Sequence, residues 1–163
     1  MKKLKSAGFS LTEILLIVSA LIVFVGILLP VYLNYSHRSR FSAKLIVFHI
    51  AQAEVSTELS YGDASVMKKR GDNNLYSLKG FTNSQEETRK ISGTDIQINY
   101  NGVLSKSFSD SSLGVGEIIL TPYLKTRKHQ IQDYYIVWDC KIKSNESFSE
   151  SAMPGDCIFQ KIN

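Results

Sequence analysis

A long apolar stretch near the amino terminus, residues 8–33, constrains this chain more than any other feature. It reads GFSLTEILLIVSALIVFVGILLPVYL, and a short basic segment with Lys2, Lys3 and Lys5 precedes it. About 20 consecutive apolar residues are enough for a helix to cross a bilayer. Residues 14–33 contain no Lys, Arg or His. A chain with such a segment has to cover it with a membrane or with other proteins.

One carboxylate, Glu13, lies just inside this stretch. An acidic side chain at the centre of a membrane helix costs roughly 2.5–3.5 kcal/mol, and less near an end, so it needs a partner. The apolar run carries no cation, which leaves another chain, a lipid head group or a nearby amino terminus. Cleavage after Gly8 would leave Phe9 with a free α-amine four residues before Glu13, on the same face of a helix. Two such chains, shifted by about one turn, could neutralise each other's charges, so the pattern indicates self-assembly.

The residues around this charge resemble the prepilin signature of type IV pilins. The shared pattern is a Lys-rich leader, Gly8, Phe9, a hydroxyl residue, Leu11, Thr12, Glu13 and an apolar helix. Other residue types also fall where pilins place them: Gly26, Pro30, Tyr32, Tyr35 and Arg38. The resemblance is close over residues 1–60 and holds in outline beyond them. Thr12 stands where family members usually have Ile, and the helix is bulkier than that of many abundant pilins, which favours a minor pilin.

The resemblance implies a precursor that a prepilin peptidase cuts between Gly8 and Phe9 and methylates at the Phe9 amine. It implies that Glu13 meets the amino terminus of a neighbouring subunit, so the partners are other pilin subunits. It places the precursor in a bacterial inner membrane and the mature chain in an extracellular pilus. The expected domains are a leader at 1–8, an assembly or transmembrane helix at 9–33 and a globular head at 34–163.

Two simpler interpretations compete with this one. A secretory signal peptide also has a basic start and an apolar core, but residues 27–36 offer no small-x-small cleavage site. A plain single-span anchor fits the length, but it leaves the Gly8-Phe9 pair and Glu13 unexplained. The prepilin interpretation accounts for all of these features.

Composition and the number of cysteines limit what the rest of the chain can be. Its 163 residues hold one domain comfortably. The formal net charge is +4, and it falls to +1 without the three leader lysines, so the basic isoelectric point does not by itself indicate nucleic-acid binding. Cys140 and Cys157 lie near the carboxy terminus, where a disulfide is the default for an exported domain. It would contribute roughly 3 kcal/mol by constraining the unfolded chain.

Periodicity predicts an α+β fold, in which a long amino-terminal helix packs on a small antiparallel sheet of about four strands. Beyond the apolar stretch, apolar residues recur at helical spacing: Phe41, Leu45, Phe48, Val55 and Leu59. The polar residues between them are typical of a solvated face: Lys44, Gln52, Glu54 and Glu58. A helix from Phe9 to about Leu59 would be roughly 75 Å long. A kink or local melting is expected between Gly26 and Pro30.

Residues 61–93 have no clear period and are predicted to form an irregular loop. The sheet is expected in residues 94–163, with strands at 94–100, 117–124, 131–140 and 157–162 and a hairpin turn at Asn101-Gly102. The resemblance implies that a loop closed by Cys140 and Cys157 ties the last strand to the sheet edge.

No motif predicts an enzyme, a cofactor or a metal site. His37, His49 and His129 are far apart in the chain and lack metal-ligand spacing, and two cysteines without a nearby His do not complete a zinc shell. Ser65 and Lys68 match the short S-x-x-K pattern of serine acyl enzymes, but neither K-T-G nor S-D-N follows.

A second functional hypothesis rests on the basic cluster Lys125, Arg127 and Lys128, expected at the tip of the strongest hairpin. With the nearby tyrosines it could bind DNA phosphates and stack bases. Some minor pilins of natural transformation bind DNA, so the resemblance allows a DNA-binding role in competence or adhesion. A basic hairpin tip also protects sheet edges and keeps a loop soluble. A third possibility is a pseudopilin of type II secretion, which the cysteine pair disfavours.

Overall fold

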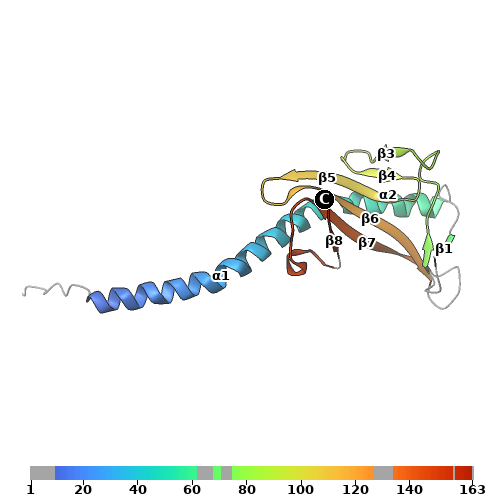
Figure 1. The fold of residues 1–163 in the computed structure, drawn as a ribbon. Helices are drawn as coiled ribbons and strands as arrows, with labels where there is room; N and C mark the ends of the chain where they lie inside the picture. Colours follow the sequence, from blue (N-terminus) through green and yellow to red (C-terminus); the bar gives the residue numbers. More distant parts are fainter. Residues whose placement is uncertain (1–9, 62–67, 71–74, 127–133, 156, 163) are drawn as a thin grey trace, which may run out of the picture. The chain divides into compact units, whose positions relative to one another are not determined.

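The computed structural model describes residues 10–61, 68–70, 75–126, 134–155 and 157–162. The chain divides into two compact units, an amino-terminal unit at residues 1–36 and a head unit at residues 37–163. The elements are α1 (Leu11–Ile46), α2 (Phe48–Tyr61), β1 (Lys68–Arg70), β2 (Leu75–Ser77), β3 (Thr88–Lys90), β4 (Gln97–Asn99), β5 (Leu104–Asp110), β6 (Gly114–Thr126), β7 (Tyr134–Ser144), the short 3₁₀ helix η1 (Glu150–Ala152) and β8 (Ile158–Lys161) (Figure 1).

The helical part of the described chain is interrupted once. α1 stays helical through both Gly26 and Pro30, so the expected local melting is absent, and the alternative expectation of a kink there stays a prediction. A proline removes one backbone donor and crowds the preceding turn, and a helix of this length retains its other hydrogen bonds. The interruption lies at Val47, between α1 and α2.

The sheet is organised around β6, the longest strand. β7 pairs with β6 antiparallel along one edge, from Gly116 to Thr126. The other edge of β6 is divided: β5 pairs with it as far as Leu120, and β2 pairs with it from Tyr123 onward. β4 and β3 continue the sheet beyond β5, and β1 continues it beyond β2.

The α+β class is confirmed, but the sheet is larger than predicted and is not purely antiparallel. Eight strands are present in the part of the chain that the structure describes. Strands predicted from alternation correspond to β4, β6, β7 and β8, and β5 follows the predicted Asn101-Gly102 turn, where Gly102 has a φ of +74°. β8 runs parallel to β7, which contradicts the predicted direction.

The segment 61–93, predicted to be irregular, contains β1, β2 and β3. Each of these strands has three residues. Three residues are too few for an alternating pattern to stand out from chance. Their pairing with longer neighbours makes them strands, and that pairing is invisible in the local sequence.

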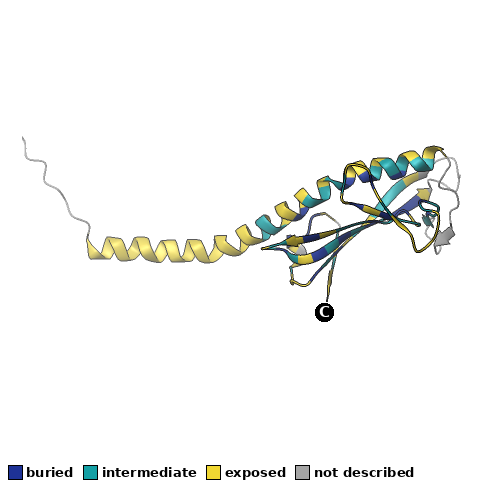
Figure 2. Ribbon diagram, turned by 90° about the horizontal axis from the view of Figure 1, so that it is seen from above, coloured by how far each residue is buried: buried dark blue, intermediate teal, exposed yellow. Residues whose placement is uncertain are grey.

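The hydrophobic core of the head unit lies between the helices and one face of the sheet. Its helical side is the predicted stripe: Phe41, Phe48 and Val55 are buried, and Leu45 and Leu59 pack against them. The sheet contributes inward side chains from β4 to β7, among them Ile98, Leu104, Ile118, Leu124 and Ile142. By contrast, residues 11–33 of α1 are exposed on every side (Figure 2).

Candidate functional site

Ser10 and Glu13 organise the start of α1. The backbone N–H of Ser10 donates to Oε2 of Glu13 at 3.2 Å, and the N–H groups of Glu13 and Ile14 donate to the Ser10 carbonyl. This is one of the two hydrogen bonds of a capping box, the one in which the side chain of the third helical residue accepts the N–H of the cap residue. Here Glu13 is the third residue and Ser10 is the cap. Glu13 therefore has a hydrogen-bond partner within its own chain.

The signal for this arrangement is in the sequence, as the S-x-x-E spacing of Ser10 and Glu13. The expected partners of the carboxylate were a neighbouring chain, a lipid head group or an amino terminus, whereas the structure shows the Ser10 N–H of its own chain. A negative charge in the first turn also interacts favourably with the helix dipole. Gly8 and Phe9, the expected cleavage and methylation residues, lie outside the described residues, so their roles stay predictions.

The apolar segment of α1 presents its side chains outward all round. Leu21, for example, is 57% exposed. A helix that is apolar on every side is typical of a membrane span or of the core of a large protein. By length and composition, this helix could cross a membrane, although a signal sequence has the same two properties.

Cys140 and Cys157 form the predicted disulfide, with their Cα atoms 4.4 Å apart. The bond joins β7 to the residue that precedes β8. The loop that it closes carries Phe148, whose ring centroid lies 5.3 Å from that of Phe41 and 5.2 Å from that of His37. The disulfide thus holds in place a segment that covers the beginning of the helix in the head unit.

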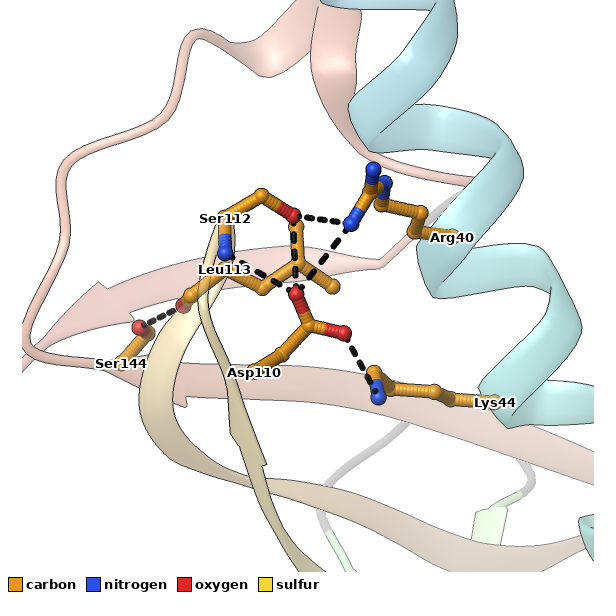
Figure 3. Close-up of polar contacts among 6 residues, drawn as sticks. All are labelled: Arg40, Lys44, Asp110, Ser112, Leu113 and Ser144. Carbon is orange, nitrogen blue, oxygen red and sulfur yellow. Dashed lines mark hydrogen bonds and ion pairs between the residues drawn. The ribbon is translucent and has the colours of Figure 1, made fainter.

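Arg40, Lys44, Asp110 and Ser112 form a polar cluster, the Asp110 clamp, between α1 and the turn from β5 to β6 (Figure 3). Oδ1 of Asp110 accepts the backbone N–H of Ser112 at 3.0 Å and its hydroxyl at 2.8 Å. Arg40 Nη1 lies 3.5 Å from the same oxygen and donates to Ser112 Oγ at 2.7 Å. Lys44 Nζ lies 3.3 Å from Oδ2.

These contacts hold the pKa of Asp110 well below its usual range. The backbone N–H of Ser112 is the largest cause, its hydroxyl adds to it, and Lys44 contributes a hydrogen bond and its charge. The turn is anchored from behind by the buried Ser144, whose hydroxyl donates to the Leu113 carbonyl at 2.8 Å (Figure 3). The carboxylate therefore accepts hydrogen bonds from its own turn, and Ser144 of β7 anchors that turn.

A second ion-pair cluster, the Arg89 clamp, joins β3 to α2. Arg89 Nη1 donates to Oε1 of Glu54 at 2.6 Å, and its Nη2 donates to Oε1 of Glu58. The hydrogen bond to Glu54 is the main reason that the pKa of Arg89 is raised. Glu54 and Glu58 are four residues apart and so lie on one face of the helix.

The two clamps correct the prediction that Lys44, Glu54 and Glu58 form a solvated face. Each of these residues lies next to the buried stripe of the helix, and its side chain forms an ion pair with Asp110 or Arg89 of the sheet. Long side chains can lie along apolar surface while their charged ends stay partly wet. Helical spacing placed these residues beside the core correctly, but it carried no information about what faces them.

The predicted DNA-binding cluster is described only in part. Lys125 is exposed on β6, in register with Tyr135 of β7, which is 42% exposed. Tyr123, two residues earlier on the same face of β6, is buried. Arg127 and Lys128 lie outside the described residues, so the cluster stays a prediction.

The other candidates for chemistry are scattered. His37 packs against Phe148, and Nδ1 of His49 lies 3.2 Å from Oε1 of Gln52. His129 and Ser65 lie outside the described residues. Among the residues that are described, no three His, Cys, Asp or Glu side chains are grouped so as to hold a metal ion.

No family model matches this chain, and no solved structure matches it significantly.

Proposed function

We propose that this chain is a type IV pilin-like subunit, made as an inner-membrane precursor and assembled into a pilus through its amino-terminal helix. One observation carries the proposal: an apolar helical segment, exposed all round, has its one carboxylate in the first turn. Such a surface needs a covering that the described residues of the chain do not supply. A membrane supplies it first, and the equivalent helices of neighbouring subunits supply it in the filament.

Glu13 is the residue that gives this packing its register. Residues 14–33 carry no cation, so the carboxylate has to find its counter-charge outside the segment once water is excluded. In the proposed mechanism, cleavage between Gly8 and Phe9 creates an α-amine, and the amine of one subunit pairs with Glu13 of the next. The hydrogen bond from the Ser10 N–H holds the carboxylate in the first turn, at the depth where a neighbouring amino terminus would arrive.

The test is intact mass and amino-terminal sequencing of the protein from sheared surface filaments and from membranes. We expect a mature chain that begins at methylated Phe9 in the sheared fraction. A chain that begins at Met1 and is found only in membranes would contradict the proposal.

Glu13→Gln removes the negative charge but keeps the capping hydrogen bond, because Gln also serves in a capping box. The variant therefore tests the charge alone. We expect this variant to be processed but at least tenfold depleted from the sheared fraction. Ser19→Ala is a matched control in the same segment, since Ser19 Oγ only bonds the Leu16 carbonyl of its own helix. Equal depletion of both variants would show that the charge of Glu13 has no specific role in assembly.

The exposed Lys125 beside the exposed Tyr135 favours DNA binding as a second candidate function. We expect single-stranded DNA to bind the full chain in a salt-sensitive way, measured by fluorescence anisotropy. Binding should be lost when Lys125, Arg127 and Lys128 are all changed to Gln. Binding that survives this triple change would exclude the cluster as the site.

A further inference from the structure

On one edge of β6 the partner strand changes between Leu120 and Tyr123. β5 pairs with β6 as far as Leu120 and β2 pairs with it from Tyr123, so Thr121 and Pro122 have no partner in register on that edge among the described residues. Proline has no N–H to donate, and within sheets it is confined to edges and irregularities. Pro122 therefore suits a position where the ladder is interrupted.

A cavity of about 500 Å³ occupies this interruption. The volume is within the range of small-molecule sites, which is roughly 300–1,000 Å³. Its polar and aromatic lining comes from the residues after β2, from the turn between β4 and β5, and from β6: Lys79, Gln85, Tyr100, Asn101, Thr121 and Tyr123. The turn itself is fixed by Asn99, whose Oδ1 accepts the N–H groups of Asn101 and Val103 at 3.0 Å each.

The two main walls of the cavity are held together by backbone groups. The N–H groups of Gly80 and Phe81 donate to the Tyr100 carbonyl at 2.8 and 3.2 Å. The Phe81 ring lies against Gly102 so closely that a Cβ at Gly102 would be 2.7 Å from Cε2 of the ring. The cavity is thus formed before a ligand arrives, which lowers the ordering cost of binding.

The lining has the chemistry of a site for a small polyhydroxylated anion. Tyr100 and Tyr123 offer flat apolar rings with polar ends, and the amides of Gln85 and Asn101 can both donate and accept hydrogen bonds. Lys79 contributes donors and a positive charge, and none of the described residues that line the cavity is acidic. A sugar ring has an apolar C–H face and a rim of hydroxyls. A sugar acid also carries a carboxylate, which can form an ion pair with the Lys79 amine.

We propose that this cavity binds an acidic saccharide, of which a uronic acid is the simplest member. Its carboxylate pairs with Lys79, its ring lies against Tyr100, and its hydroxyls meet Asn101 and Thr121. An apolar ligand would leave the polar lining unpaired, and a neutral sugar would leave the Lys79 amine without a counter-charge. The inference concerns the head unit alone and does not depend on filament assembly.

The test is saturation-transfer NMR on the full chain, with sodium glucuronate and glucose as probes. The protein is held in micelles of lauryldimethylamine oxide, because alkyl glycoside detergents would present sugars of their own. We expect glucuronate to bind with a Kd in the millimolar range or below, and glucose to bind at least fivefold more weakly. Failure of both sugars to bind, or equal binding of the two, would overturn the proposal.

Two variants locate the site, and a third serves as the control. Lys79→Gln is expected to weaken glucuronate binding at least fivefold and to leave glucose binding unchanged. Tyr100→Ala removes the ring but keeps the carbonyl that holds Gly80 and Phe81, and it is expected to weaken both sugars. Lys141→Gln removes an exposed lysine of β7 that does not line the cavity, and it is expected to change neither.

Three further results would each overturn the proposal. One is an equal loss of glucuronate binding in Lys141→Gln, which would mean non-specific charge attraction. Another is unchanged binding in both Lys79→Gln and Tyr100→Ala, as judged with variants whose circular dichroism matches that of the wild type. The third is full displacement of glucuronate by an equal concentration of inorganic phosphate, which would mean that Lys79 binds any anion.

Discussion

The two helical regions of this chain share a backbone conformation and differ in where their apolar side chains end up. Residues 11–33 are exposed on all sides, whereas Phe41, Phe48, Ala51 and Val55 are at most 1% exposed. The first region is apolar at nearly every position, and the second is apolar along one stripe with charged residues beside it. A stripe can be covered by the chain's own sheet, but a helix that is apolar all round needs a covering from outside the chain.

The charged residues beside the stripe add a second difference. In the head unit, the Asp110 and Arg89 clamps tie the helices to the sheet at four helical positions. Between Leu11 and Leu33, Glu13 is the only ionisable side chain apart from Tyr32, and its hydrogen bond is to its own helix. The head is stabilised by contacts within the chain, and the apolar segment depends on its surroundings.

The sharpest test of this comparison removes one large side chain from each region. Phe41→Ala leaves a cavity beside Phe108 and Phe148, and we expect it to lower the free energy of unfolding of the head by about 3–5 kcal/mol. Leu21→Ala should change it by less than about 0.5 kcal/mol. Chemical denaturation of the full chain in micelles, followed by the fluorescence of its one tryptophan, Trp138, measures both. Similar losses in the two variants would break the comparison.

Removal of the disulfide tests how far the head depends on its carboxy-terminal loop. Cys140→Ala with Cys157→Ala should lower the free energy of unfolding by about 3 kcal/mol, because the unfolded chain loses its cross-link. Phe148 lies in the closed loop, so adding Phe148→Ala should cost less in this background than in the wild type. Strict additivity would show that the loop covers Phe41 without help from the disulfide.

The Asp110 clamp predicts a pH dependence that belongs to the head alone. Asp110→Asn should lower the free energy of unfolding by about 1–2 kcal/mol at pH 7, because the hydrogen bonds to a charged acceptor are weakened. The pKa of Asp110 is lower in the folded state than in the unfolded state, so its contribution is complete above the ordinary Asp pKa, about 3.9. It is lost as the pH falls below that value.

The difference in melting temperature between wild type and Asp110→Asn should therefore shrink from pH 6 toward pH 3. Asp95→Asn is the matched control, since Asp95 is 80% exposed and lies 4.0 Å from Lys90. If the difference in melting temperature stays constant over this pH range, the charge of the Asp110 carboxylate is not the cause of the stabilisation.

The Arg89 clamp should give the smallest effect, because Arg89 is 38% exposed and its ion pairs are partly screened. Arg89→Gln is expected to lower the free energy of unfolding by about 0.5–1 kcal/mol in low salt. The loss should decrease in 1 M NaCl, where the screening length is about 3 Å. Lys90→Gln, at a more exposed neighbour, should have no measurable effect. A loss that is the same in both salts would point to packing instead of charge.

Much of the fold could be predicted from local pattern. The helical stripe, the strands β6 and β7 and the Asn101-Gly102 turn all leave a periodic or turn-specific signal over a few residues. The disulfide followed from cysteine number and the expected export of the chain. The capping hydrogen bond of Glu13 was equally readable, because the S-x-x-E spacing is local.

The features that were missed depend on segments far apart in the chain. Asp110 meets Arg40 and Lys44 across about 70 residues, and three-residue strands become strands only when a neighbour pairs with them. The parallel direction of β8 depends on the path between Ser144 and Ile158, and the cavity depends on where β5 and β2 each stop along β6. Local residue pattern specifies which face of an element is apolar. Which partner that face meets, and which polar groups are thereby brought together, is settled only when distant segments pack.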